Sequence, residues 1–181
     1  GEFGRIPGSP IAYWVSDRLR ALFGELEPFE AEGRTARHGA ATLDDIRFAR
    51  SWLEVTPGDP TWVGLAKGGS YAPYYADVLL VLKWLDHGAE LKAYASAVRA
   101  RNGWGEHWSA VLNGYSFYFR PGITWPHRSA RFSAAALPSN CIFSQSGKAA
   151  FAPTGNLPTL LGLMNGSVIT LLCRVQSDAV R

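Results

Sequence analysis

Three stretches of the chain have apolar residues at the spacing of an amphipathic helix. The first runs from Ile11 to Phe23 and is followed by Gly24, a residue type that commonly ends helices. The second covers residues 88–101, and the third covers residues 156–174, where an Asn and a Pro mark the start. The pattern therefore predicts helices near both ends of the chain and one in its middle.

Between these helices the pattern changes to that of strands. Polar and apolar residues alternate through residues 47–55, which predicts a strand, and residues 62–66 predict a shorter one before a Lys-Gly-Gly-Ser turn. The continuous apolar run 78–85 fits a buried strand and a short helix equally well. Further short strand-like runs, separated by breaks that contain proline, cover residues 115–119, 123–125, 132–137 and 141–144.

These elements predict an α+β fold with a β-rich central region and flanking helices. Hydrophobic residues make up 47% of the 181 residues and aromatic residues 13%, which suffices for a packed core and argues against disorder. We expect one domain over residues 11–181. Residues 1–10 contain Glu-Phe and Gly-Ser, dipeptides that two common cloning sites encode, so we expect this stretch to be an expression scar.

Charge is distributed unevenly along the chain. Residues 11–98 hold nine Lys/Arg and twelve Asp/Glu, a net charge of −3, whereas residues 99–181 hold eight Lys/Arg and two Asp/Glu, a net charge of +6. No acidic residue occurs between Glu106 and Asp178. A long acid-free, basic region suits contact with a polyanion. An apolar core region with few charges of either sign explains the same pattern.

Several kinds of reactive site are missing from the sequence. The four histidines and two cysteines lack metal-ligand spacing, and there is no P-loop and no Gly-x-Ser-x-Gly elbow. Cys141 and Cys173 suit buried thiols in a reducing cytoplasm better than a disulfide. The apolar run 160–173 is shorter than the roughly 20 residues that cross a bilayer. We therefore expect a cytoplasmic chain without a metal site or a membrane partner.

Several blocks together resemble a known family. Residues 119–125, Phe-Arg-Pro-Gly-Ile-Thr-Trp, resemble the Tyr-Phe-Lys-x-Gly-Ile-Thr-Trp block in the C-terminal specificity domains of adenine-specific DNA methyltransferases of the TaqI-like and BREX phage-exclusion types. Residues 67–71, Lys-Gly-Gly-Ser-Tyr, are similar to the Lys-Gly-Gly segment of that family. Further blocks, two before and three after these, occur in the family's order at residues 12–16, 47–55, 131–134, 143–144 and 160–165. The resemblance extends from Ile11 to Cys173.

The resemblance implies a target-recognition domain that reads double-stranded DNA for a parent N6-adenine methyltransferase, in restriction-modification or phage defence. The parent would use S-adenosylmethionine, and its catalytic domain, on the same chain, would flip out the adenine. Such catalysis needs a glycine-rich turn for the cofactor and an (Asn/Asp/Ser)-Pro-Pro-(Tyr/Phe) loop. Neither occurs in this sequence. We therefore expect this fragment to be non-catalytic and to hold no cofactor.

Two residues near the Lys-Gly-Gly turn are candidates for contact with DNA phosphates. Lys67 follows a predicted strand and precedes two glycines, so its ammonium group and the nearby backbone amides suit a phosphate. The alternative is an ordinary glycine turn with an exposed lysine. Tyr71 offers a hydroxyl group to a phosphate, and packing is the alternative role for its ring.

A second group of candidates lies on the predicted central hairpin, within twelve positions. Strand alternation would place several of its side chains on one face, and Arg recognises guanine through O6 and N7. A solvated hairpin face is the alternative. The polar loop 144–148 offers Gln145 for adenine and Lys148 for guanine or phosphate. The hairpin group comprises Arg120, Thr124, His127, Arg128 and Arg131.

Two other functions fit the same sequence. The many aromatic residues suit a protein-interaction or scaffold module of a phage-defence complex. A catalytic role through a less familiar motif is the second. Binding to DNA that weakens steeply with salt separates a DNA reader from a protein-interaction module, because only the former displaces counterions from phosphates.

Overall fold

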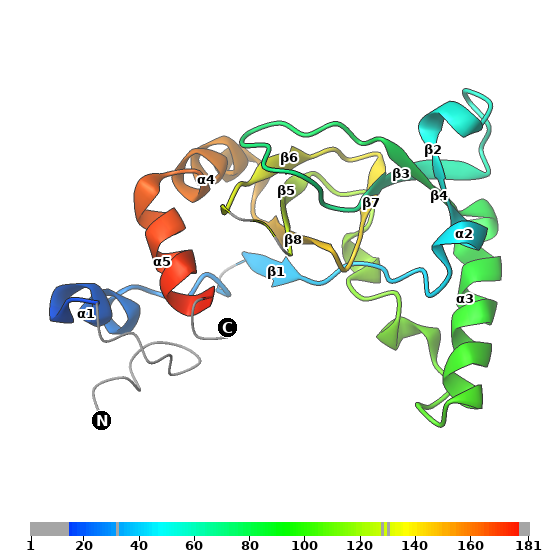
Figure 1. Ribbon diagram of the computed structural model, residues 1–181, viewed down its shortest axis with the longest axis horizontal. Coiled ribbons are helices and arrows are strands. Elements are labelled where there is room, and N and C mark those ends of the chain that lie inside the picture. Colours follow the sequence, from blue (N-terminus) through cyan, green and yellow to red (C-terminus); the bar gives the residue numbers. More distant parts are fainter. Residues whose placement is uncertain (1–14, 32, 128, 130, 178–181) are drawn as a thin grey trace.

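The computed structural model describes residues 15–31, 33–127, 129 and 131–177, and it has two four-stranded sheets with helices at both ends of the molecule (Figure 1). Helix α3 stands at one end, while α1, α4 and α5 gather at the other. The predicted α+β class is confirmed. The helices are α1 (Asp17–Glu25), α2 (Asp45–Phe48), α3 (Leu85–Arg101), α4 (Leu157–Met164) and α5 (Ser167–Ser177).

The first sheet is antiparallel and has the strand order β1-β8-β5-β6. Its register pairs Trp125 with Lys148, so these two side chains share one face of the sheet. Residues Thr124 and Ala149, one step along, share the opposite face. The strands are β1 (Thr35–Arg37), β5 (Gly122–Pro126), β6 (Ala135–Leu137) and β8 (Gly147–Phe151).

The second sheet has the order β2-β4-β3-β7, in which β3 and β7 run parallel and the other neighbours run antiparallel. Its last strand, β7, is joined to β8 of the first sheet by the short turn 144–146. This turn therefore lies where the two sheets meet, next to the end of β3. The strands are β2 (Ala49–Ser51), β3 (Trp62–Ala66), β4 (Leu80–Lys83) and β7 (Cys141–Phe143).

The main core lies between the sheets and is rich in aromatic rings. Phe143 has no exposed surface and packs against Tyr118 and Phe151, with ring centroids 5.6 and 5.3 Å away. Tyr118 is also buried, and its hydroxyl group donates to the carbonyl oxygen of Asn113 at 2.9 Å. Burial, the main cause, raises the pKa of Tyr118 far above its usual value, so the phenol stays a donor. Most aromatic residues of the centre of the chain thus serve packing.

Two predicted strands are wrong, and short helical turns take their place. Within residues 47–55 only β2 is a strand, because the side chain of Asp44 caps α2 and a Ser51–Glu54 capping box starts a 3-10 turn. Residues 115–117 also form a 3-10 turn, which begins after Gly114 at a φ of 69°. The run 78–85, left open between strand and helix, contains strand β4.

The predicted C-terminal helix is broken into α4 and α5. Asn165 lies at the break, and its side-chain amide accepts from the backbone N–H of Ala134 at 3.0 Å and donates to the carbonyl of Ala134 at 2.8 Å. This tie to the first sheet fixes the bend. No single helix among the described residues has the length and apolarity to cross a membrane; the pair 154–164 and 167–173, bent by 75°, meets those criteria only when taken together.

The helix predicted from residue 11 begins at Asp17, after the N-cap Ser16, and it continues past Gly24 to Glu25. Residues 11–14 of that prediction lie outside the described residues. Residues 1–10, the expected expression scar, lie outside the described residues. Cys141 and Cys173 are not joined in a disulfide: Cys141 is buried and Cys173 is half-buried. Burial raises the pKa of each thiol.

Candidate nucleic-acid interface

Three turns and one residue after β1 meet at the junction of the two sheets and enclose an open hollow of about 640 Å³. The turns follow β3, follow β5, and connect β7 to β8. Segments of the chain that are far apart in the sequence therefore contribute to one polar surface. The hollow is lined by His38, Lys67, Gly68, Gly69, Pro126, His127, Gln145 and Ser146.

Backbone hydrogen bonds hold these turns together. The N–H of Ser144 donates to the carbonyl of Ala66 at 2.9 Å, the N–H of Gln145 donates to that of Ala40 at 2.8 Å, and the N–H of His127 donates to that of Ser146 at 2.8 Å. The turn between β7 and β8 is thus tied to β3, to the segment after β1 and to the end of β5. Its conformation is set by these contacts and leaves its outward side chains available.

Close backbone approach at this junction requires glycine. Gly68 has a φ of +77°, and a Cβ atom on it would lie 2.6 Å from the carbonyl oxygen of Ser146. A Cβ atom on Gly147 would lie 2.8 Å from the backbone nitrogen of Gly68. Gly69, by contrast, faces open space. The Lys-Gly-Gly motif therefore includes one glycine that the packing needs and one that it does not.

Lys67 carries the positive charge of the hollow, and an acidic residue compensates it. The ammonium group of Lys67 forms an ion pair with the carboxylate of Asp45, which also accepts from the hydroxyl group of Thr42. The hydrogen bond from Lys67, followed by the one from Thr42, lowers the pKa of Asp45. A second hollow of about 360 Å³ contains Asp45 and shares Lys67, Gln145 and Ser146 with the first.

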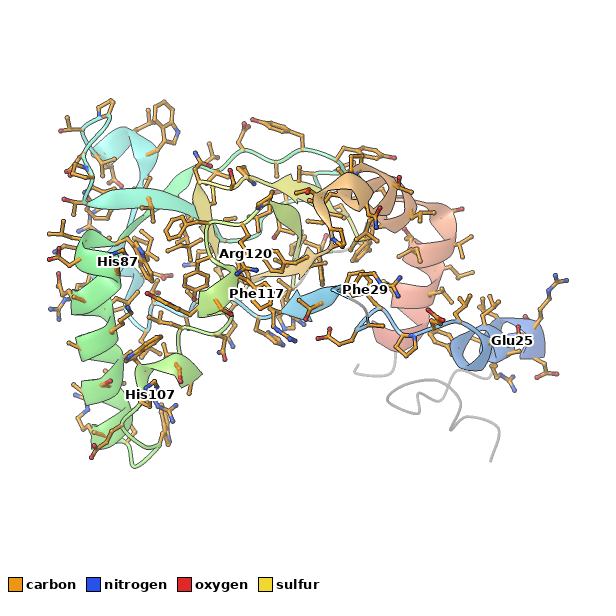
Figure 2. The ribbon with its side chains drawn as sticks, turned by 180° about the vertical axis from the view of Figure 1, so that it is seen from behind. Glu25, Phe29, His87, His107, Phe117 and Arg120 are labelled. Carbon is orange, nitrogen blue, oxygen red and sulfur yellow. The ribbon has the colours of Figure 1, made fainter. Side chains whose placement is uncertain are left out.

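The predicted candidates on β5 and β8 are only partly brought together. His127 lines the hollow, whereas Arg120 precedes the other end of β5 and its guanidinium group lies 5.2 Å from the ring centre of Phe117 (Figure 2). The hydroxyl group of Thr124 donates to the carbonyl of Lys148 at 2.9 Å and supports the sheet. Lys148 itself lies two residues after Ser146, the last lining residue of its turn, on the face that it shares with Trp125.

The remaining candidates lie on loops. Tyr71 is 53% exposed on the long segment from β3 to β4, which crosses to β6 and pairs there through Tyr74 and Ala135. Arg131 is exposed between β5 and β6, and its carbonyl accepts from the hydroxyl group of Ser129 at 2.6 Å. Arg128 lies outside the described residues.

The basic residues differ in whether an acid neutralises them. Arg37 pairs with Glu30, and both Arg47 and Lys83 pair with Glu90. In the part of the chain that the structure describes, Arg120, Arg131 and Lys148 have no acidic side chain within ion-pair distance. The basic residues with acidic partners therefore lie in the first half of the chain, and Arg120, Arg131 and Lys148, without one, lie in the second half.

The histidines do not form a cluster. His87 and His107 lie at opposite ends of α3 (Figure 2), while His38 and His127 line the hollow. Among the described residues, no group of three or more His, Cys, Asp or Glu side chains is arranged to hold a metal ion. His38 was not predicted as a site residue, because a lone histidine in a polar segment carries no signal of its position in the fold.

No family model matches the chain. It is 31% identical over 170 residues to the adenine-specific methyltransferase PglX of Lacticaseibacillus casei, which covers 83% of the chain and 13% of that protein. It is 28% identical over 189 aligned residues to the adenine-specific methyltransferase BrxX of Escherichia coli O9:H4, which covers 95% of the chain and 14% of that protein. The chain is thus related to a segment of about one seventh of these adenine-specific methyltransferases.

Proposed function

We propose that this chain is a non-catalytic DNA target-recognition domain that contacts double-stranded DNA for a parent N6-adenine methyltransferase of a phage-defence system. The observation that carries the proposal is the hollow at the junction of the sheets, where Lys67, His127 and Gln145 come together from three separate turns. The similarity to proteins named adenine-specific methyltransferases supports DNA as the ligand. S-adenosylmethionine and the catalytic domain would belong to the rest of the parent chain.

The charge distribution supports contact with the phosphate backbone. Lys148 lies on β8 opposite Trp125, and Arg131 lies on the connection from β5 to β6 that also carries His127. Neither is neutralised by an acid among the described residues. Cations without an acidic partner displace counterions from DNA when they bind. Lys148 and Arg131 would therefore position the duplex. Lys67 and Tyr71, on the segment after β3, would add phosphate contacts, and Thr124 would stabilise the sheet beneath them.

The test is a titration of labelled duplex DNA of random sequence at two salt concentrations. The double variant Arg131→Ala/Lys148→Ala is expected to bind more weakly and to lower the slope of log affinity against log salt by about 2, since each phosphate contact contributes about 0.9. The control is Arg18→Ala/Arg101→Ala, which removes the same charge from exposed helical positions. Duplex affinity that does not change with salt concentration, or an equal loss of affinity in both double variants, would contradict the proposal.

Arg120→Ala maps the extent of the surface. Arg120 and His127 flank β5 at its opposite ends, so the seven steps between them span up to about 23 Å at roughly 3.3 Å per residue. If weakening by Arg120→Ala equals that by Lys148→Ala, the DNA surface spans the whole strand. If only Lys148→Ala weakens binding, the surface is restricted to the end of β5 that carries the hollow.

Asp45→Asn is expected to strengthen duplex binding by up to about fivefold, the equivalent of roughly 1 kcal/mol. The change removes a negative charge from the second hollow and releases the ammonium group of Lys67. Asp86→Asn is the matched control, because Asp86 is also exposed and has a φ of 50°, which Asn accepts. Fluorescence titration at low salt measures both variants, and weaker binding of Asp45→Asn would contradict a role for Lys67.

The same ion pair predicts how stability depends on pH. Because the folded-state pKa of Asp45 is lowered, the stabilisation is present above the unfolded value near 4 and is lost as pH falls through the folded value. About half of the Asp45 side chain is exposed, so solvent screening keeps the contribution below about 1 kcal/mol. Between about pH 5 and pH 3, roughly 1 unit on either side of the ordinary aspartate pKa, Asp45→Asn should lose less stability than the wild type. Acid unfolding followed by circular dichroism measures the difference.

A protein-interaction role is the second candidate, and a separate surface favours it. Leu53 and Leu79 are 73% and 58% exposed. Both lie beside Trp52: Leu53 follows it in the chain, and the backbone N–H of Trp52 donates to the carbonyl of Leu79 at 3.1 Å. Exposed apolar residues that adjoin one another often mark protein contacts. This surface is suited to the catalytic domain of the parent chain, and the salt titration separates such a contact from DNA binding.

A further inference from the structure

Gln145 is exposed at the tip of the turn between β7 and β8, yet the backbone beneath it is fixed. Its N–H donates to the carbonyl of Ala40, and Ser144, which precedes it, is 4% exposed. The hydroxyl group of Ser144 accepts from the N–H groups of Ser146 at 3.2 Å and Gly147 at 3.1 Å. The turn therefore presents the Gln145 side chain from a rigid base.

The side-chain amide of Gln145 is not used by the fold. It makes no hydrogen bond with the described residues, although the side chain lines both hollows. The neighbouring polar groups are engaged: Lys67 is bound to Asp45, and the hydroxyl group of Ser144 accepts two backbone bonds. Gln145 thus leaves the N–H donor and the C=O acceptor of one amide open to the hollow.

The chemistry of a glutamine amide identifies what it can read. Its N–H and C=O groups lie side by side and match the N7 acceptor and N6 donor that adenine presents in the major groove. A single-atom hydroxyl such as that of Ser146 cannot make this bidentate contact. Phosphate contacts from Lys148 and Arg131 would hold the duplex, while an amide on a rigid turn adds discrimination between bases.

We propose that Gln145 is a specificity-determining residue that reads an adenine of one A·T base pair within the recognised DNA sequence. This inference rests on the proposed DNA-binding function and deepens it by naming a base and a side chain. It requires that base preference at one position depend on the Gln145 amide, while general affinity for duplex DNA depends on the basic residues.

The experiment selects duplexes from a random-sequence pool with the wild-type chain at low salt and sequences the bound fraction. Wild type is expected to enrich adenine at one fixed position by roughly 5- to 150-fold, the range of one bidentate contact. Gln145→Ala is expected to lose that preference and keep binding to random duplex DNA within about threefold, as a lost base contact leaves the phosphate contacts in place. Gln145→Glu is expected to move the preference to cytosine, whose N4 group is a donor.

Asn140→Ala is the control, since it removes an exposed side-chain amide from the turn before β7, outside both hollows, and should retain the adenine preference. Thermal unfolding checks that each variant is folded. Enrichment that is unchanged in both Gln145 variants, or a wild-type selection without any base preference, overturns the role of Gln145 while duplex binding stands. Absence of salt-sensitive duplex binding by the wild type overturns the proposed function as well, so the two failures are distinguishable.

Discussion

Replacement of Phe143 by alanine is expected to lower the free energy of unfolding by about 3–5 kcal/mol. The ring has no exposed surface and contacts Tyr118 and Phe151 between the two sheets, so its removal leaves a cavity that the sheets cannot close. Its carbonyl also accepts the N–H of Ala40 at 2.9 Å, which ties β7 to the segment after β1. Urea denaturation followed by far-ultraviolet circular dichroism measures the change.

Trp104→Ala serves as the control for this loss of aromatic surface. Trp104 is 61% exposed after α3, and replacement of an exposed side chain usually changes stability by less than about 0.5 kcal/mol. If Phe143→Ala unfolds within 1 kcal/mol of the wild type, on the order of an average substitution, Phe143 does not anchor the core. The result also bears on the hollow, because the turn that carries Gln145 follows Phe143 directly.

The fold could be predicted from the sequence where hydrophobic burial decides the structure. The short strand-like runs 62–66 and 123–125 and the helical spacing of residues 88–101 predict β3, β5 and α3, and all three elements are present. The prediction for residues 47–55 failed because polar side chains bind the backbone there. Asp44 and Ser51 cap short helical turns inside a segment whose alternation resembles a strand, and a periodicity measured over nine residues does not register such local bonds.

The candidate site was predictable as separate pieces but not as one surface. The Lys-Gly-Gly turn, His127 and the loop with Gln145 could each be identified by residue type. Their proximity depends on the parallel pairing of β3 with β7 and the antiparallel pairing of β5 with β8, contacts between residues far apart in the sequence. The same pairing separates Arg120 from His127, although only six positions lie between them in the sequence.

The backbone at Gly68 is where the fold and the proposed function depend on the same atoms. Gly68→Ala is expected to lower the free energy of unfolding by about 1–3 kcal/mol, since alanine is strained at a φ of +77°. Its Cβ atom would also lie 2.6 Å from the carbonyl oxygen of Ser146, so the turn that presents Gln145 must move away from β3. Duplex affinity is expected to fall on the order of tenfold, the equivalent of about 1.4 kcal/mol.

Gly69→Ala isolates this effect because it changes the next residue of the same motif. No atom lies within 4 Å of a Cβ atom built on Gly69, and its φ falls outside the left-handed region. Stability within about 0.5 kcal/mol of the wild type and unchanged duplex binding are therefore expected. Equal losses in the two variants would show that flexibility of the Lys-Gly-Gly turn matters to binding. A loss confined to Gly68→Ala, in both urea denaturation and DNA titration, would show that the close approach of β3 to the Gln145 turn shapes the DNA-binding surface.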